Sequence, residues 1–202
     1  MARLSFFCDN SCKVYTYNLL FEQYIMVRLI ATLGKTVGGP IETFENLVNA
    51  NYISAFPSHK VDINEVIVIT TKETEETFYV LKSVFLCCAN FTKVREVTLP
   101  FDDITAPDDF ITIREKVREV LRAGDYLDFS GGRKAISAAA ALAAREIGAH
   151  LVTSIIDEDE YDKIRKRYYE IKDKALSIYN KGQCISYLCD LYISKARTIV
   201  LF

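Results

Sequence analysis

The sequence predicts an α/β protein in which a mostly parallel sheet is covered by helices on both faces. Two observations carry this prediction. Short runs rich in valine and isoleucine alternate along the chain with longer stretches of helical periodicity. One of these runs, Val66-Ile67-Val68-Ile69, is continuously apolar, which indicates a strand buried on both faces.

The expected elements follow one another along the chain. A first strand ends at Leu33, and Pro40 opens a helix because proline suits a first helical turn. Gly124 stops a later helix, since glycine is common just after a helix end. Further strands are expected at 65–71, 95–99, 126–129, 150–156 and 198–202, a loop at 51–64, and helices at 40–49, 73–89, 107–122, 135–146 and from 157.

The length and composition predict a single domain that is preceded by an extension. The chain has 202 residues, of which 50% are hydrophobic and 26% charged, and this is enough for one domain with a core. Residues 1–25 mix polar and aromatic residues without a clear period and do not resemble a signal peptide. We expect them to be an upstream extension that activity does not require, with the domain spanning residues 26–202.

Several classes of partner do not fit this sequence. The net charge is −2, so nucleic acid must be held by a local basic pocket, and long duplex DNA is not an expected ligand. No run of 18 apolar residues occurs, so no membrane association is expected. The location expected for such a protein is the cytoplasm.

The cysteines lack the spacing of a zinc site. No Cys-x-x-Cys pair occurs, and we expect reduced, mostly buried thiols. Cys184 and Cys189 could pair in an oxidising compartment. The six cysteines are Cys8, Cys12, Cys87, Cys88, Cys184 and Cys189.

Neither a metal nor an organic cofactor is expected. The two histidines, His59 and His150, have no partner at ligand spacing. A nicotinamide or flavin oxidoreductase is disfavoured because no Gly-x-Gly-x-x-Gly follows a strand. Four acidic residues crowd one loop, where turn and helix-cap roles are the better explanation: Asp102, Asp103, Asp108 and Asp109.

The first strand ends in a glycine-rich loop that contains a cation and a hydroxyl. Gly34-Lys35-Thr36 resembles the end of a Walker A loop, but that motif needs glycine five positions before Gly34, where Leu29 stands. We therefore reject an ATPase. Together with Gly38 and Gly39, the loop remains suited to phosphate or ribose.

A second glycine loop joins a strand to an alanine-rich helix. Gly131 and Gly132 permit close approach of a ligand, and Arg133 and Lys134 add charge to the positive end of the helix dipole. Such a site suits phosphate. An ordinary strand-to-helix turn with solvated cations explains the same residues equally well.

The two loops are expected at one edge of the sheet, outside the carboxyl ends of parallel strands. Lys195, near the last strand, adds another cation. Lysine and arginine can stabilise a phosphoryl transition state without metal, so metal-free RNA cleavage by a ribose 2′-hydroxyl is possible.

With both loops, the sequence resembles a known family. Residues 26–34 with Thr36 and Gly38-Gly39, joined to Asp128-x-Ser130-Gly131-Gly132-Arg133-Lys134, are similar to the stand-alone CARF-domain ring nucleases of type III CRISPR defence. The resemblance spans residues 26–202. It implies a Rossmann-like homodimer that binds cyclic tetra-adenylate across its interface, cleaves it without metal to di-adenylates ending in 2′,3′-cyclic phosphate, and so ends the signal.

The resemblance also implies roles for individual residues. Thr36 matches a hydroxyl residue that is usually serine, and its additional methyl can slow turnover. Arg133 and Lys134 match the phosphate-binding basic pair of the family. Lys195 matches a lysine late in the chain that stabilises the transition state, and Tyr161 matches a tyrosine that follows the fifth strand. The expected catalytic residues are Thr36, Lys134 and Lys195, and the expected ligand-binding residues are Gly34, Lys35, Gly38, Gly131, Gly132, Arg133 and Tyr161.

A second reading remains open from the sequence. A non-catalytic sensor of the same fold would bind the ring and act through a separate partner. Tight binding without turnover would identify it.

Overall fold

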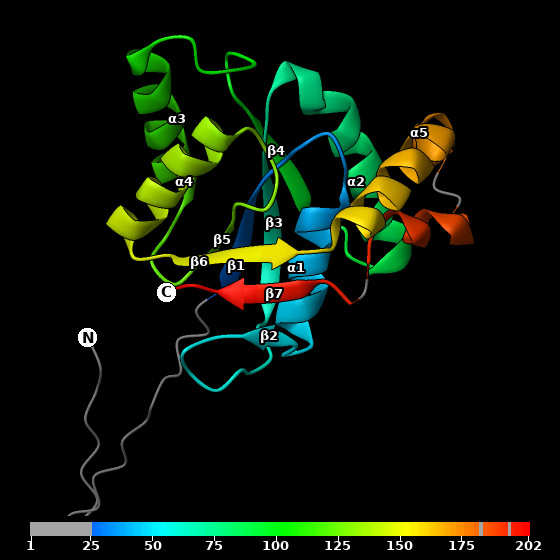
Figure 1. The fold of residues 1–202 in the computed structure, drawn as a ribbon, viewed down its shortest axis with the longest axis horizontal. Helices are drawn as coiled ribbons and strands as arrows, with labels where there is room; N and C mark the ends of the chain where they lie inside the picture. Colours follow the sequence, from blue (N-terminus) through cyan, green and yellow to red (C-terminus); the bar gives the residue numbers. More distant parts are fainter. Residues whose placement is uncertain (1–25, 182–183, 194) are drawn as a thin grey trace, which may run out of the picture.

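The computed structural model describes residues 26–181, 184–193 and 195–202 (Figure 1). The expected extension, residues 1–25, lies outside the described residues. The elements are β1 (Val27–Thr32), α1 (Gly38–Val48), β2 (Tyr52–Ile53), β3 (Ile63–Thr70), η1 (Lys72–Thr74), α2 (Glu75–Cys88), β4 (Val94–Thr98), α3 (Pro107–Val120), β5 (Tyr126–Asp128), α4 (Lys134–Ile147), β6 (His150–Ile155), α5 (Glu158–Lys181), η2 (Ser186–Leu191) and β7 (Arg197–Val200).

The predicted fold class is confirmed. The strands form one sheet in the order β2-β7-β6-β5-β1-β3-β4, and every neighbouring pair is parallel except β6 and β7. The order β4-β3-β1-β5-β6 is that of a Rossmann-like, doubly wound sheet. After β1, the chain adds β3 and β4 on one side of this strand and β5 and β6 on its other side, so the strand order reverses between β1 and β5. Such a reversal places a crevice beyond the carboxyl ends of these two strands.

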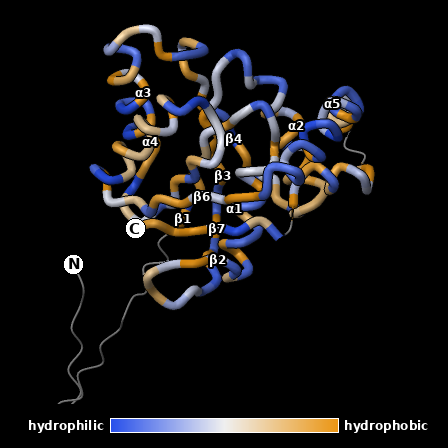
Figure 2. The backbone as a smooth tube through the Cα atoms, in the orientation of Figure 1, coloured by the Kyte–Doolittle hydropathy of each residue, from blue (hydrophilic) through white to orange (hydrophobic). Residues whose placement is uncertain are grey.

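Two hydrophobic cores hold the layers together, and Figure 2 shows the hydrophobic residues concentrated along the central strands. One core packs α1, α2, α5 and η2 on one face of the sheet. The other packs α3 and α4 on the opposite face. In α4, Ala139, Ala140, Ala143 and Ala144 are fully buried, because small side chains let this helix lie close to the strands.

Some predicted boundaries were wrong. Helix α1 starts at Gly38, two residues before Pro40. The segment predicted as a loop at 51–64 contains β2, which pairs with β7 through Tyr52 and Ile53. A strand of two residues has too short a sequence pattern to be recognised, and its pairing with β7 supplies the backbone partners that define it.

The prediction of reduced, buried cysteines was also wrong. Cys87 is bonded to Cys184 and Cys88 to Cys189, across sequence separations of 97 and 101 residues. Cys184 is exposed and the other three are half-buried. The end of α2 packs against η2, and this tertiary contact brings together cysteines that the sequence gives no reason to pair. Cys8 and Cys12 lie outside the described residues.

Candidate functional site

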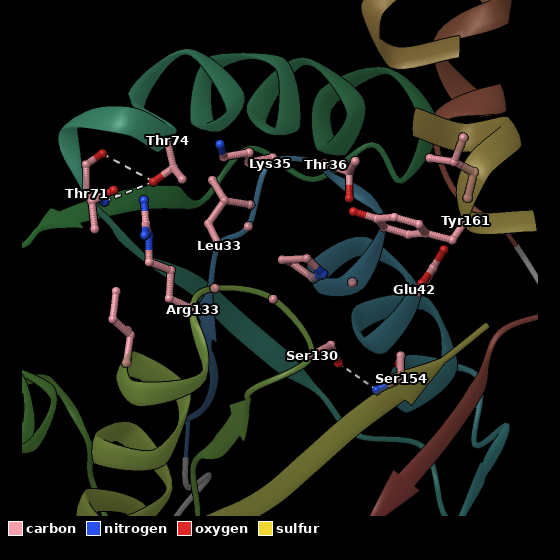
Figure 3. A pocket seen from close by; sticks show the side chains of 18 of the residues that line it. Leu33, Lys35, Thr36, Glu42, Thr71, Thr74, Ser130, Arg133, Ser154 and Tyr161 are labelled. Atoms are coloured by element: carbon pink, nitrogen blue, oxygen red, sulfur yellow. Dashed lines mark hydrogen bonds between the residues drawn. The ribbon is translucent and has the colours of Figure 1, made fainter. Parts of the chain in front are cut away.

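A cavity of about 330 Å³ lies where β1 and β5 end, at the point where the strand order reverses. Its walls come from the segments after β1, β3, β4, β5 and β6 and from the starts of α1 and α5 (Figure 3). The structure brings most of the predicted residues together here: Gly34, Lys35, Thr36, Gly38, Gly131, Gly132, Arg133 and Tyr161 all line the cavity.

The two glycine loops touch through their backbones. The Thr32 hydroxyl donates to the Gly131 carbonyl oxygen at 2.6 Å. A Cβ atom at Gly131 would lie 2.5 Å from the Thr32 carbonyl oxygen and 2.9 Å from the Gly34 nitrogen. Glycine is therefore required at this contact. Gly132 has φ +87°, a conformation that also favours glycine.

Two helices begin at the cavity. The first turn of α1 contributes Gly38 and Gly39 to the wall, and Arg133 directly precedes α4. No side chain caps the start of either helix in the described structure. Free backbone N–H groups and the positive ends of two dipoles therefore face the same space, and both favour an anion.

Arg133 is held by two carboxylates from other loops. Its guanidinium contacts Glu73 Oε2 at 2.9 Å and Asp103 Oδ2 at 2.5 Å. Glu73 in turn donates its backbone N–H to Asp102 Oδ1 at 3.2 Å. Asp103 makes a local turn contact, since its Oδ1 accepts the Ile104 backbone N–H at 2.9 Å, whereas Asp102 contacts Glu73 of η1. Asp103 is also paired with Arg133, the cation that was expected to bind phosphate.

A buried aspartate, Asp128, stabilises the glycine loop after β5 through hydrogen bonds to Ser130. Asp128 Oδ1 accepts the Ser130 backbone N–H at 2.8 Å and also the Ser130 hydroxyl. Ser130 Oγ accepts the Ser154 backbone N–H at 2.6 Å, which ties the loop to β6 (Figure 3). Burial raises the pKa of Asp128 to about 6. The Asp128 side chain therefore sets the conformation that Gly131 and Gly132 need.

Glu42 is a cavity residue that the sequence did not indicate. It lies on α1 and is only 2% exposed, and its Oε1 accepts the Ile193 backbone N–H at 2.9 Å. Burial raises its pKa to about 7, with the Ile193 hydrogen bond opposing this shift and the charge of Asp128 adding to it. Sequence pattern gives no such signal, because the contact joins residues 151 positions apart.

The raised pKa predicts that Glu42→Gln changes the pH dependence of stability. Burial favours the neutral carboxyl of Glu42 in the folded state. The contribution of Glu42 to the free energy of unfolding is therefore fully present below the unfolded pKa of 4.5 and is lost as pH rises through about 7. The native protein should therefore lose up to roughly 3 kcal/mol of unfolding free energy between pH 4.5 and 8 relative to Glu42→Gln. Urea unfolding at pH 5 and pH 8 measures this difference. An equal change in the free energy of unfolding for the two proteins would contradict the prediction.

The remaining two predicted residues lie beside the cavity. Lys134 is the exposed first residue of α4 and follows Arg133 directly. Lys195 is exposed in the turn before β7 and lines a neighbouring hollow together with Ile156 and Glu160. Ile156 lines both spaces, so this hollow adjoins the cavity.

Figure 3 shows that Thr36 and Tyr161 point toward one another on one side of the cavity, with Glu42 close to Tyr161. Tyr161 comes from the first turn of α5 and Thr36 from the loop before α1. The arrangement places the Thr36 and Tyr161 hydroxyl groups on one side of the cavity and Arg133 on the other. It can thus bind an anion and contact a sugar hydroxyl at the same time.

The part of the chain that the structure describes holds no cluster of three or more His, Cys, Asp or Glu residues that could bind a metal ion. Its helices include none that is both long and apolar enough to cross a membrane.

Asp109 caps α3, since its Oδ2 accepts the backbone N–H groups of Thr105 and Ala106, each at 2.8 Å.

Comparison with known proteins identifies a close relative. No protein-family model matches the chain. Among solved structures, Enterococcus italicus Csm6 bound to cyclic hexa-2′-fluoro-hexa-dAMP aligns with a TM-score of 0.44 and 12% identity, over 87% of this chain and 41% of that one. A CRISPR system ring nuclease of Saccharolobus solfataricus is 40% identical over 184 residues, which cover 86% of this chain and 98% of the relative. The chain therefore belongs to the CRISPR system ring nucleases.

Proposed function

We propose that this ring nuclease binds cyclic tetra-adenylate at the cavity and opens it, without a metal ion, into linear di-adenylates that end in 2′,3′-cyclic phosphate. The observation that carries the proposal is the meeting of two glycine loops and two uncapped helix starts around one cavity. This arrangement offers backbone donors and positive charge to a phosphate of the ring. We place the reaction in the cytoplasm and expect neither DNA nor membranes as partners.

The proposed reaction is an attack of a ribose 2′-hydroxyl oxygen on its neighbouring phosphorus. The new oxygen–phosphorus bond forms as the bond to the 5′-oxygen breaks, and the proton of the 2′-hydroxyl ends on the 5′-oxygen. Thr36 and Tyr161 orient the ribose, which brings the attacking oxygen in line with the leaving one. Arg133, Lys134 and Lys195 stabilise the negative charge that develops on the phosphate oxygens.

We further propose that the active form is a two-fold homodimer. A cavity of about 330 Å³ lies at the small end of ligand sites and is too small for a ring of four nucleotides. The ring has approximate two-fold symmetry, so a symmetric dimer is its natural receptor. Two copies of each basic loop would then face the four phosphates, and cleavage at two opposite phosphates gives two di-adenylates.

The direct test is incubation of the protein with cyclic tetra-adenylate in EDTA, with products separated by chromatography. We expect full conversion to di-adenylates with 2′,3′-cyclic phosphate. Lys195→Ala should lower the single-turnover rate by about 100-fold with little change in Kd, because it removes charge stabilisation in the transition state. The control is Lys116→Ala, which removes a surface lysine paired with Glu119 on α3. An intact ring after prolonged incubation with excess enzyme would refute the proposal, and tight binding without cleavage would favour a sensor.

The carboxylates that hold Arg133 predict a change in affinity. Glu73 and Asp103 compete with a ligand phosphate for the same guanidinium. Glu73→Gln combined with Asp103→Asn should therefore lower the Kd for cyclic tetra-adenylate by about 3–10-fold at low salt, an effect that added salt reduces. Titration calorimetry at two salt concentrations measures it. Weaker binding by the double variant would show that the carboxylates orient Arg133 for the ligand.

A further inference from the structure

Two buried polar residues of α1 contact the segment near the end of the chain. Glu42 and Asn46 are separated by four positions, which places them on one side of the helix. They are 2% and 4% exposed. Buried polar side chains are costly unless they are hydrogen-bonded, so their partners indicate what they do.

Both residues bind the segment that contains Lys195. Glu42 Oε1 accepts the backbone N–H of Ile193 at 2.9 Å. Asn46 Nδ2 donates to the carbonyl oxygen of Ala196 and to the hydroxyl of Thr198, each at 2.8 Å. The two side chains thus hold the backbone on both sides of Lys195.

The two contact points are joined to each other. The Ala196 N–H donates to the Ile193 carbonyl oxygen at 3.1 Å, which brings the backbone on the two sides of Lys195 close together. The Asn46 amide is itself oriented by Asn51, whose Nδ2 donates to Asn46 Oδ1 at 2.8 Å. The position of the backbone on the two sides of Lys195 is therefore defined by side chains of α1 and of the residues just after it.

The same helix also forms part of the cavity. Gly38 and Gly39, in its first turn, line the cavity, and Glu42 and Asn46 follow on its next two turns. A helix is a rigid element, so α1 fixes the distance between the cavity wall and the backbone on the two sides of Lys195. Lysine has a flexible stem, and the placement of its backbone then decides which atoms its ammonium group reaches.

We propose that Glu42 and Asn46 are positioning residues for the reaction: together they hold the backbone at Ile193 and Ala196 so that Lys195 reaches the scissile phosphate. This inference rests on the proposed role of Lys195. Neither residue needs to touch the reacting atoms. Their effect is on the rate of the chemical step, because a displacement of about 1 Å in a catalytic group can cost 100-fold in rate.

The test compares single-turnover rates and Kd values for cyclic tetra-adenylate at saturating enzyme. Asn46→Leu and Glu42→Leu should each lower the rate by about 10–100-fold and change the Kd by less than about threefold. Glu42→Gln keeps an oxygen that can accept the Ile193 N–H, and should restore most of the rate lost in Glu42→Leu. Asn49→Ala is the matched control, since the Asn49 side chain bonds only to Glu45 on its own helix among the contacts described. Asn46→Ala replaces Asn46→Leu if the latter does not fold.

A double-mutant cycle separates positioning from general damage. In the Lys195→Ala background, Asn46→Leu should slow the reaction by less than about twofold, because the lysine that it positions is already gone. An equal loss in both backgrounds would overturn the proposal. So would wild-type rates in Asn46→Leu and Glu42→Leu while Lys195→Ala is slow, which would leave the proposed function intact. A wild-type rate in Lys195→Ala would instead refute the assigned role of that lysine.

Discussion

Replacing Gly131 by alanine should lower the affinity for cyclic tetra-adenylate by at least about 100-fold, and should destabilise the protein by roughly 1–3 kcal/mol. The added Cβ would lie 2.5 Å from the Thr32 carbonyl oxygen, a distance that real Cβ atoms do not tolerate. The neighbouring atoms are backbone and cannot rotate away. The two loops must therefore separate, and the backbone donors on both sides of the cavity then no longer converge on one phosphate.

Gly124→Ala is the matched control. Gly124 has φ +82°, so alanine is strained there, but no atom lies within 4 Å of the added Cβ. This variant should lose about 1 kcal/mol of stability and keep its affinity for the ring. Equilibrium unfolding and calorimetric titration of both variants measure the two effects. If Gly131→Ala bound the ring like the native protein, contact between the loops would not be what shapes the site.

The features that sequence predicted are those encoded within a few neighbouring residues. The apolar run at Val66–Ile69 marked a buried strand, and the glycines at 131 and 132 marked a turn with a helix start behind it. The mostly parallel sheet followed, because strands that alternate with helices favour parallel pairing. The two loops were expected at one edge of the sheet for the same reason, and they line one cavity.

The features that sequence did not predict depend on contacts between distant segments. Arg133 meets Glu73 and Asp103, which are 60 and 30 positions away. Nothing in the sequence around Glu42 distinguishes it from other helix residues, and its role comes from the hydrogen bond that the Ile193 backbone N–H donates to it. The disulfides join two adjacent helix positions to a segment about 100 residues later. Local propensity contains no information about any of these pairs, and only the packed tertiary structure defines them.

A buried ion pair at the opposite end of the sheet gives the largest expected effect on stability. Asp125, just before β5, pairs with Arg28 of β1, and the two side chains are 2% and 8% exposed. Asp125 also accepts the backbone N–H of Arg28 at 3.1 Å and that of Arg122 at 2.8 Å. Asp125→Ala should cost roughly 3–5 kcal/mol, because it leaves the buried guanidinium without its partner charge.

This loss should leave the reaction intact, since Arg28 and Asp125 lie at the amino ends of β1 and β5 while the cavity lies at their carboxyl ends. Thermal unfolding should show a Tm lowered by roughly 6–20 °C, with cleavage at 20 °C near the native rate. Glu65→Ala, which breaks the exposed Arg95–Glu65 pair, should cost less than about 1 kcal/mol. Removing both charges in Arg28→Met/Asp125→Leu should recover part of the loss, because the main penalty is the uncompensated charge and not the missing pair. A double variant less stable than Asp125→Ala would show that the pair itself contributes the stability.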